Sequence, residues 1–201
     1  MQRQENVREQ GSRVTELQCH SNGCATAAPR RIRRLRGGRR AADPGPVTGR
    51  QGYGAGMHVR TMEQADLPAV LALSAELGYP AKPGELAERF AVLARSPADA
   101  LLVAEREGEV LGYLQVQERW HLESGRGAEL VALVVSSRAR RSGAGRALVA
   151  EACRWAKARG MGRMRVRSNV QRVESHRFYP ALGFRAVKTQ QVYELALEGE
   201  A

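Results

Sequence analysis

The sequence predicts an α/β protein of the α+β type, with a mixed, largely antiparallel central sheet and helices on both faces. Two observations carry this prediction. Some apolar runs of strand length are joined by short turns, as in antiparallel hairpins, and others are separated by amphipathic runs of helical period, as in crossovers. The expected order is strand, two helices, three strands, helix, strand, helix and two strands. A chain of 201 residues has room for one such domain and a tail.

The domain is expected to begin with a short strand and two helices. The strand covers 58–62, and apolar residues then recur at helical spacing over 66–77, where Pro68 is tolerated in the first turn. A second helix is expected over 85–95. The break Gly78-Tyr79-Pro80 between the helices predicts the mouth of a site.

Three strands are expected next. The first two, at 101–105 and 110–117, are joined across 106–109, whose Glu-Gly-Glu tip is typical of a tight hairpin turn. The residues WHLESGRG are expected to form a loop before a buried strand over 129–135.

The last third of the chain is expected to alternate helices and strands. The patterns predict a helix over 143–159 capped by Gly160, a strand over 164–166, a helix over 171–182 closed by Gly183, and two final strands over 184–187 and 192–197.

Residues 1–56 differ in composition from residues 57–201. They contain 11 Arg, no Lys and 4 acidic residues, with seven of the arginines between Arg30 and Arg40. No sustained apolar period runs through them, so we expect a disordered Arg/Gly-rich tail before the folded domain. Because Met57 is followed at once by a strand, a turn and an amphipathic helix, we hypothesise that Met57 is the native start.

The composition argues against several other classes of function. The tail lacks the aromatic interleaving of a single-strand nucleic-acid binder, and no apolar run is long enough to span a membrane. We therefore expect a cytoplasmic protein without nucleic-acid or membrane partners. Cys19, Cys24 and Cys153 are too few for a disulfide framework, and no second ligand pair at zinc spacing follows His20, so no metal site is expected.

The stretch ELVALVVSSRARRSGAG, residues 129–145, predicts an anion-binding site. An apolar β-branched strand runs into a polar turn, and a helical pattern begins at Gly143. Glycines at this point let a ligand approach the unpaired N–H groups of the first helical turn, where the helix dipole favours negative charge. Arg140, Arg141 and Arg146 add positive charge at the same place.

The run Arg140-Arg141-Ser142-Gly143-Ala144-Gly145 resembles the Arg/Gln-x-x-Gly-x-Gly/Ala motif of the GNAT superfamily of acyl-CoA N-acyltransferases. Asn169 after the next strand, and Phe178-Tyr179 with Leu182-Gly183-Phe184 after it, resemble the superfamily's second motif. The resemblance covers Met57 to about Leu197, and RSNVQRVESHRFYPALGF is similar to the aminoglycoside-acetylating branch.

The resemblance implies that acetyl-CoA is bound as co-substrate, without a metal, where the central strand and the strand after the helix splay apart. Backbone groups of Leu133, Val134 and Val135 would pair with the pantetheine arm, and the amides of 141–146 would hold the pyrophosphate. Asn169 would contact the pantetheine arm. The remaining cofactor-binding candidates implied by the motifs are Arg140, Arg141, Ser142, Gly143, Ala144, Gly145, Arg146, Ser175 and Phe178.

Two residues are candidates for the proton transfers of acetylation. Glu129 lies where some superfamily members carry a catalytic glutamate, and partial burial beside apolar neighbours would raise its pKa toward a useful value. The alternatives are a charged strand end and a glutamate that binds a cationic acceptor. Tyr179 is the candidate acid, or else a core aromatic paired with Phe178. Pro180 departs from the family pattern and removes a backbone N–H donor from the last helical turn, which would displace the Tyr179 hydroxyl if that turn is distorted. His176 is an alternative proton carrier or else a surface residue.

The expected reaction is transfer of an acetyl group to a primary amine of a small molecule. Acceptor contacts are expected from the loop 120–123, the break at 78–80 and Glu76, whose aromatic and acidic groups suit a cationic amine. Acetylation of a protein N-terminus or lysine is one alternative. A catalytically silent acyl-CoA-binding module is the alternative from another class. The expected partners are acetyl-CoA and the amine, and homodimerisation is left open.

Overall fold

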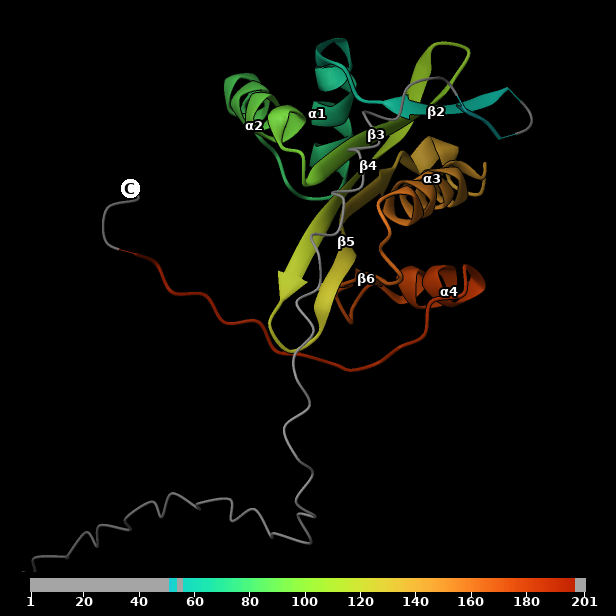
Figure 1. Ribbon diagram of the computed structural model, residues 1–201. Helices are drawn as coiled ribbons and strands as arrows, with labels where there is room; N and C mark the ends of the chain where they lie inside the picture. The colour runs from blue at the N-terminus through green and yellow to red at the C-terminus, as the bar shows by residue number, and fades with distance from the viewer. Residues whose placement is uncertain (1–50, 54–55, 198–201) are drawn as a thin grey trace, which may run out of the picture. The chain divides into compact units, whose positions relative to one another are not determined.

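The computed structural model describes residues 51–53 and 56–197, which form a sheet with helices packed on both of its faces (Figure 1). The sheet has six strands in the order β1-β2-β3-β4-β5-β6. Each neighbouring pair is antiparallel except the last, β5 and β6, which run parallel. The predicted fold class, a mixed and largely antiparallel sheet with helices on both faces, is confirmed.

The elements follow the predicted order through the last helix. The strands are β1 (Gln51–Gly52), β2 (Met57–Thr61), β3 (Asp99–Arg106), β4 (Glu109–His121), β5 (Gly125–Val135) and β6 (Met164–Val166). The α-helices are α1 (Leu67–Glu76), α2 (Pro83–Arg95), α3 (Ala144–Ala158) and α4 (Val173–Ala181), and short 3-10 turns cover Gln64–Asp66 and Ser137–Ala139.

The two faces of the sheet have separate apolar cores. Helix α3 covers one face, where Leu102, Leu114 and Leu148 are fully buried. Helices α1 and α2 cover the other face with a smaller core around Val70 and Val103. A side chain on the sheet is therefore assigned to a face by its alternation along the strand.

The turn between β3 and β4 is the tight hairpin that its Glu-Gly-Glu tip predicts. Glu107 and Gly108 both have positive φ, at 53° and 84°. Two central residues in this region are the mark of a type I′ turn, whose twist matches that of the flanking strands.

The second hairpin is longer than predicted. The residues WHLESGRG were expected to form a loop, but β4 continues through His121 and β5 begins at Gly125. The ladder runs to the pair His121↔Gly125, so only 122–124 form the turn. Apolar alternation could not predict this extension, because its residues are mostly polar or glycine. A two-stranded ribbon that extends beyond the sheet needs no apolar face.

Residues 184–197 contradict the prediction of two final strands, because they lie in no helix or strand. Their apolar side chains are largely exposed, with Val192 and Tyr193 at 89% and 85%. Apolar alternation predicts an extended backbone, but a strand also needs the hydrogen-bonding edge of a neighbour. No described strand pairs with this segment.

The folded region also begins before Met57. Strand β1 pairs with β2, and the Tyr53 hydroxyl donates a 3.0 Å hydrogen bond to Oε2 of buried Glu151 on α3. The boundary drawn at Met57 therefore falls inside the sheet, and residues 51–53 belong to the folded region. The expectation of a disordered tail over 1–50 and the candidates Cys19, His20 and Cys24 lie outside the described residues. Within 51–53 and 56–197, no helix is both long and apolar enough to cross a membrane.

Candidate acetyl-transfer site

Strands β5 and β6 pair over only three residues and then part. The last matched pair is Leu130↔Val166, while β5 continues to Val135. On its other side β5 stays hydrogen-bonded to β4, where Leu133, Val134 and Val135 face Leu114, Tyr113 and Gly112. Among the described strands, none pairs with this stretch on the β6 side, so its backbone groups can accept an added strand-like ligand.

An irregularity in the β4–β5 ladder lies where the strands part. The pairing shifts between Gln115 and Val116, which face Ala132 and Leu130, so Val131 is the extra residue of a β-bulge. A bulge bends its strand and increases the local twist. This bend accompanies the separation of β5 from β6.

The turn after β5 presents backbone N–H groups at the start of α3. Arg141 and Gly143 both have left-handed backbone conformations, with φ of 62° and 92°, and Gly143 is the N-cap of the helix. The first N–H of the helix that reaches back to the cap is that of Ala147, which donates to the Gly143 carbonyl at 2.9 Å. Helix geometry leaves the N–H groups of Gly145 and Arg146 without such an acceptor, as anion binding requires.

Glycine is needed at positions 143 and 145 for different structural reasons. A side chain on Gly143 would meet no atom within 4 Å, so its glycine is required by the positive φ. A Cβ on Gly145 would lie 3.2 Å from Cζ of Phe178 and 3.5 Å from Cγ2 of Val135. Gly145 therefore allows α4 to pack against the start of α3, a role that the sequence analysis assigned instead to the approach of a ligand.

The three arginines of the motif do not share one environment. Arg140 reaches across to the first turn of α4, where Nη1 lies 3.3 Å from Oε2 of Glu174. Arg141 and Arg146 are exposed. Positive charge at this turn thus comes chiefly from Arg141 and Arg146, because the charge of Arg140 is shared with a carboxylate.

The remaining residues of the motif have local hydrogen bonds. The Ser142 hydroxyl accepts a hydrogen bond from the N–H of Ala144 at 3.3 Å, and Ala144 is buried in the first turn of α3. The side-chain amide oxygen of Asn169 accepts a hydrogen bond from the N–H of Gln171 at 2.9 Å, which orders the turn before α4. The side-chain NH₂ of Asn169 is then the group suited to donate to a ligand. Ser175 is half-buried in the first turn of α4.

Tyr179 lies on α4 between two other aromatic rings. Its ring makes edge contacts with Phe178 at 5.2 Å and Phe184 at 5.5 Å between centroids. Burial raises the pKa of the Tyr179 hydroxyl above its ordinary value, and the charge of Arg172 offsets part of this effect. The phenol therefore keeps its proton at neutral pH, as a general acid must.

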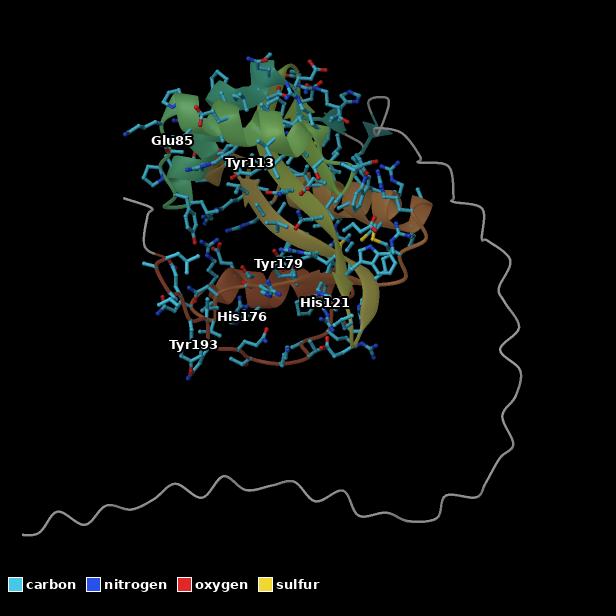
Figure 2. The ribbon with its side chains drawn as sticks, turned by 60° about the vertical axis from the view of Figure 1, so that its left-hand side comes forward. Glu85, Tyr113, His121, His176, Tyr179 and Tyr193 are labelled. Carbon is cyan, nitrogen blue, oxygen red and sulfur yellow. The ribbon has the colours of Figure 1, made fainter. Side chains whose placement is uncertain are left out.

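Pro180 does not interrupt α4 before Tyr179. The helix continues through Pro180 to Ala181, and the N–H groups of Leu182 and Phe184 both donate to the Tyr179 carbonyl. Gly183, with φ of 89°, follows the helix end as predicted. His176, on the same helix, is exposed (Figure 2).

Glu129 is buried and is bound by two guanidinium groups. It is 8% exposed, and it faces Gln117 of β4 and Arg165 of β6. Oε1 lies 2.7 Å from Nη1 of Arg167, and Oε2 lies 3.4 Å from Nε of Arg119. The candidate base is thus an ion-paired carboxylate one residue before the last pair of β5 and β6.

A family model described as "Acetyltransferase (GNAT) family" matches residues 67–184. The chain belongs to the GNAT acetyltransferase family. No curated protein sequence matches the chain significantly.

Several solved structures have a similar fold. A transcriptional regulator from Bacillus halodurans has 26% identity and a TM-score of 0.65, covering 69% of this chain and 99% of its own. An aminoglycoside N-acetyltransferase in complex with CoA has 19% identity and a TM-score of 0.65, covering 74% and 97%. Glucosamine-6-phosphate N-acetyltransferase from Arabidopsis thaliana has 19% identity and a TM-score of 0.60, covering 70% and 99%.

The protein is thus an acetyl-CoA-dependent N-acetyltransferase. The structure also brings two residues to Glu129 that were not predicted from the sequence. Arg119 and Arg167 were not among the candidates. Polar residues at every second position of β4, at Gln115, Gln117 and Arg119, were an available signal for one polar sheet face. Arg167, the residue after β6, could not be found this way, because the pairing of β5 with β6 depends on the α3 crossover.

The expected acceptor contacts of this GNAT acetyltransferase are placed apart from one another. Glu76 accepts a 2.9 Å hydrogen bond from the N–H of Ser137, which lowers the pKa of the Glu76 carboxyl and joins α1 to the turn after β5. Trp120 lies on the extended hairpin, where its indole N–H donates to Glu118 and Arg126 lies over its ring. Tyr79 is 66% exposed beside α1. These three residues form no common contact that an amine would need.

Proposed function

We propose that this acetyltransferase transfers the acetyl group of acetyl-CoA to a primary amine of a small molecule by direct attack. The parting of β5 from β6 after Leu130 carries the proposal. It leaves a strand edge that ends directly at the N–H groups of α3. One extended ligand with an anionic end would fit both features.

The donor end of the site is formed mainly by backbone groups. Leu133, Val134 and Val135 would pair with the pantetheine arm, and the N–H groups around Gly143 and Gly145 would bind the pyrophosphate. Arg141 and Arg146 would add charge there, while Asn169 would donate to the arm. Ser175 and Phe178 would line the thiol end. Acetyl-CoA supplies an activated thioester carbonyl as the electrophile.

Glu129 and Tyr179 would carry the two proton transfers. Glu129 would take a proton from the acceptor ammonium, after which the amine nitrogen forms a bond to the thioester carbon and the carbon–sulfur bond breaks. Tyr179 would give its proton to the leaving thiolate. The second proton, lost by the nitrogen as the amide forms, would return to the Tyr179 phenolate, so that one proton is released in total through Glu129. A phenol is protonated at neutral pH, so the hydroxyl has a proton to donate.

The test of this proposal is release of free CoA with a panel of small amines and peptides. Turnover with small amines but not peptides is expected, whereas turnover only with peptides would assign the enzyme to protein acetylation. Binding of acetyl-CoA without any turnover would identify a silent binding module and overturn the proposal.

Glu129→Gln tests the base role. The variant keeps the shape of the side chain and removes the proton acceptor, so kcat/KM should fall about 10²-fold or more below the amine's pKa. Near or above that pKa the loss should shrink, because the amine is already neutral. Glu88→Gln, at an exposed position on α2 and outside all site candidates, is the control. A pH–rate profile of Glu129→Gln that matches the wild type would remove Glu129 from this role.

A further inference from the structure

The surroundings of Glu129 are dominated by positive charge. The Glu129 side chain is 11% exposed, whereas those of its ion-pair partners Arg119 and Arg167 are 50% and 70% exposed. Arg165 stands in register with Glu129 on the same face and is also exposed. An acceptor that approaches this carboxylate from solvent therefore meets guanidinium groups first.

The guanidinium groups retain donors that Glu129 does not use. Each guanidinium has five N–H donors, and each of the two ion pairs with Glu129 rests on one nitrogen. The longer contact, 3.4 Å from Nε of Arg119 to Oε2, is the weaker of the two and the easier to exchange. Both arginines can therefore bind an oxyanion with little loss to Glu129.

Another carboxylate on this face, that of Asp99, accepts hydrogen bonds from neutral groups. Asp99 faces Gln117, which in turn faces Glu129, so Asp99 lies two strands away. Its oxygens accept hydrogen bonds from Gln115 at 3.0 Å, Gln117 at 3.1 Å and Ser96 at 2.7 Å. The hydrogen-bond donors to Asp99 are thus neutral side chains, and Asp99 forms no ion pair with Arg119 or Arg167.

We propose that the acceptor carries an oxyanion, a carboxylate or a phosphate, a few bonds from its reacting amine. Its ammonium binds Glu129 while Arg119 and Arg167 bind the oxyanion, so that charges alternate along the site. A polycationic amine places like charges together and is disfavoured. This inference rests on the proposed function and names the substrate class of the same site.

Matched pairs of amines test the inference. Glucosamine 6-phosphate is compared with glucosamine, and γ-aminobutyrate with its amide, by kcat/KM for CoA release. The wild type should favour the anionic member of at least one pair by about tenfold, which corresponds to about 1.4 kcal/mol. Preference in only the first pair identifies a phosphate as the oxyanion, and preference in only the second identifies a carboxylate.

Variants show whether the arginines cause the preference. Arg119→Gln and Arg167→Gln should each reduce the ratio between the two members toward one. The ratio is the readout, because any effect on Glu129 itself is common to both members. Arg126→Gln is the control, because Arg126 lies on the opposite face of the same hairpin and pairs with Glu118. It should leave the ratio unchanged.

Direct binding separates this inference from the proposed function. Calorimetric titration of each pair into the protein with CoA measures the same preference without turnover. Tighter binding of the anionic member supports the inference even if no amine is acetylated, a result that would overturn only the proposed function. Equal binding of the two members in both pairs, absence of binding in both pairs, or preference for a polycationic aminoglycoside overturns the inference.

Discussion

The substitution Gly145→Ala, which adds one methyl group, tests whether the close packing of α3 against Phe178 of α4 maintains the site. In Gly145→Ala the new Cβ would lie 3.2 Å from Cζ and 3.4 Å from Cε2 of Phe178, which is tight enough to move the ring by a few tenths of an ångström. Val135, the last residue of β5, closes the other side with Cγ2 at 3.5 Å. The methyl group can be accommodated only if the Phe178 ring on α4 yields.

The expected magnitude follows from two opposing effects. Overpacking a filled contact costs about 1–3 kcal/mol. Replacing glycine by alanine in a helix returns up to about 1 kcal/mol, and less in the first turn. The free energy of unfolding should therefore fall by about 1 kcal/mol, which lowers Tm by roughly 2–4 °C in a domain of this size.

Activity should change more than stability, because Tyr179 directly follows Phe178 on α4. Displacement of the hydroxyl by a few tenths of an ångström should lower kcat roughly three- to tenfold, given that misplacement by 1 Å can cost about 10²-fold. Thermal unfolding and CoA release measure the two effects separately. Phe178→Leu is the second variant, since a shorter side chain leaves room for the methyl group.

The double variant Gly145→Ala/Phe178→Leu decides whether the contact with Phe178 causes the loss of stability. Gly145→Ala should destabilise the Phe178→Leu background less than the wild type, with a coupling free energy of about 1 kcal/mol. Additive losses, or wild-type Tm and kcat in Gly145→Ala, would show that Phe178 does not sense this position.

Three further predictions concern other parts of the molecule. Gly143→Ala should weaken CoA binding in calorimetry and cost about 1–2 kcal/mol of stability, because an alanine at φ of 92° is strained even though no atom obstructs it; wild-type affinity would contradict the assigned turn. Tyr179→Phe should lower kcat about 10²-fold in CoA release while leaving Tm nearly unchanged, and an unchanged kcat would leave Tyr179 as a packing residue only. The Arg126 guanidinium lowers the pKa of the Glu118 carboxyl, so this pair should stabilise the fold by about 1 kcal/mol above the ordinary carboxyl pKa, and the contribution should disappear as the pH falls through the lowered value. Unfolding of Glu118→Gln from pH 7 to pH 2 checks this, and a deficit that persists unchanged at the acid end would contradict the assignment.

The elements from β2 to α4 could be predicted because local patterns and short-range geometry specify them, whereas β1 was missed. Strand β6 has the predicted bounds, and the type I′ turn at Glu107 and Gly108 follows from turn chemistry alone. The extension of the β4–β5 hairpin was missed, because its residues carry no apolar alternation. The strands expected over 184–187 and 192–197 were wrong for the opposite reason, since alternation without a neighbouring edge does not make a strand.

The candidate site divides in the same way. The turn from Val135 to Gly145 is contiguous in the chain, so its strand, its left-handed residues and its helix start are legible in one short segment. The catalytic roles of Glu129 and Tyr179 stay predictions. The partners of Glu129 are distant in sequence, since Arg119 lies on β4 and Arg167 follows β6. In the same way, Phe178 reaches Gly145 from another helix.

Residues close together in the chain were thus enough to predict the fold class and the order of the helices of this protein. The acetyl-CoA-binding residues stay a prediction. Backbone propensity, turn geometry and apolar period act over a few residues and need no knowledge of the rest of the fold. Tertiary structure alone decided that Gly145 faces Phe178 and that Glu129 lies between two arginines. The register of β5 and β6 and the packing of α4 depend on contacts across the whole domain, and those contacts set the charge that an acceptor meets.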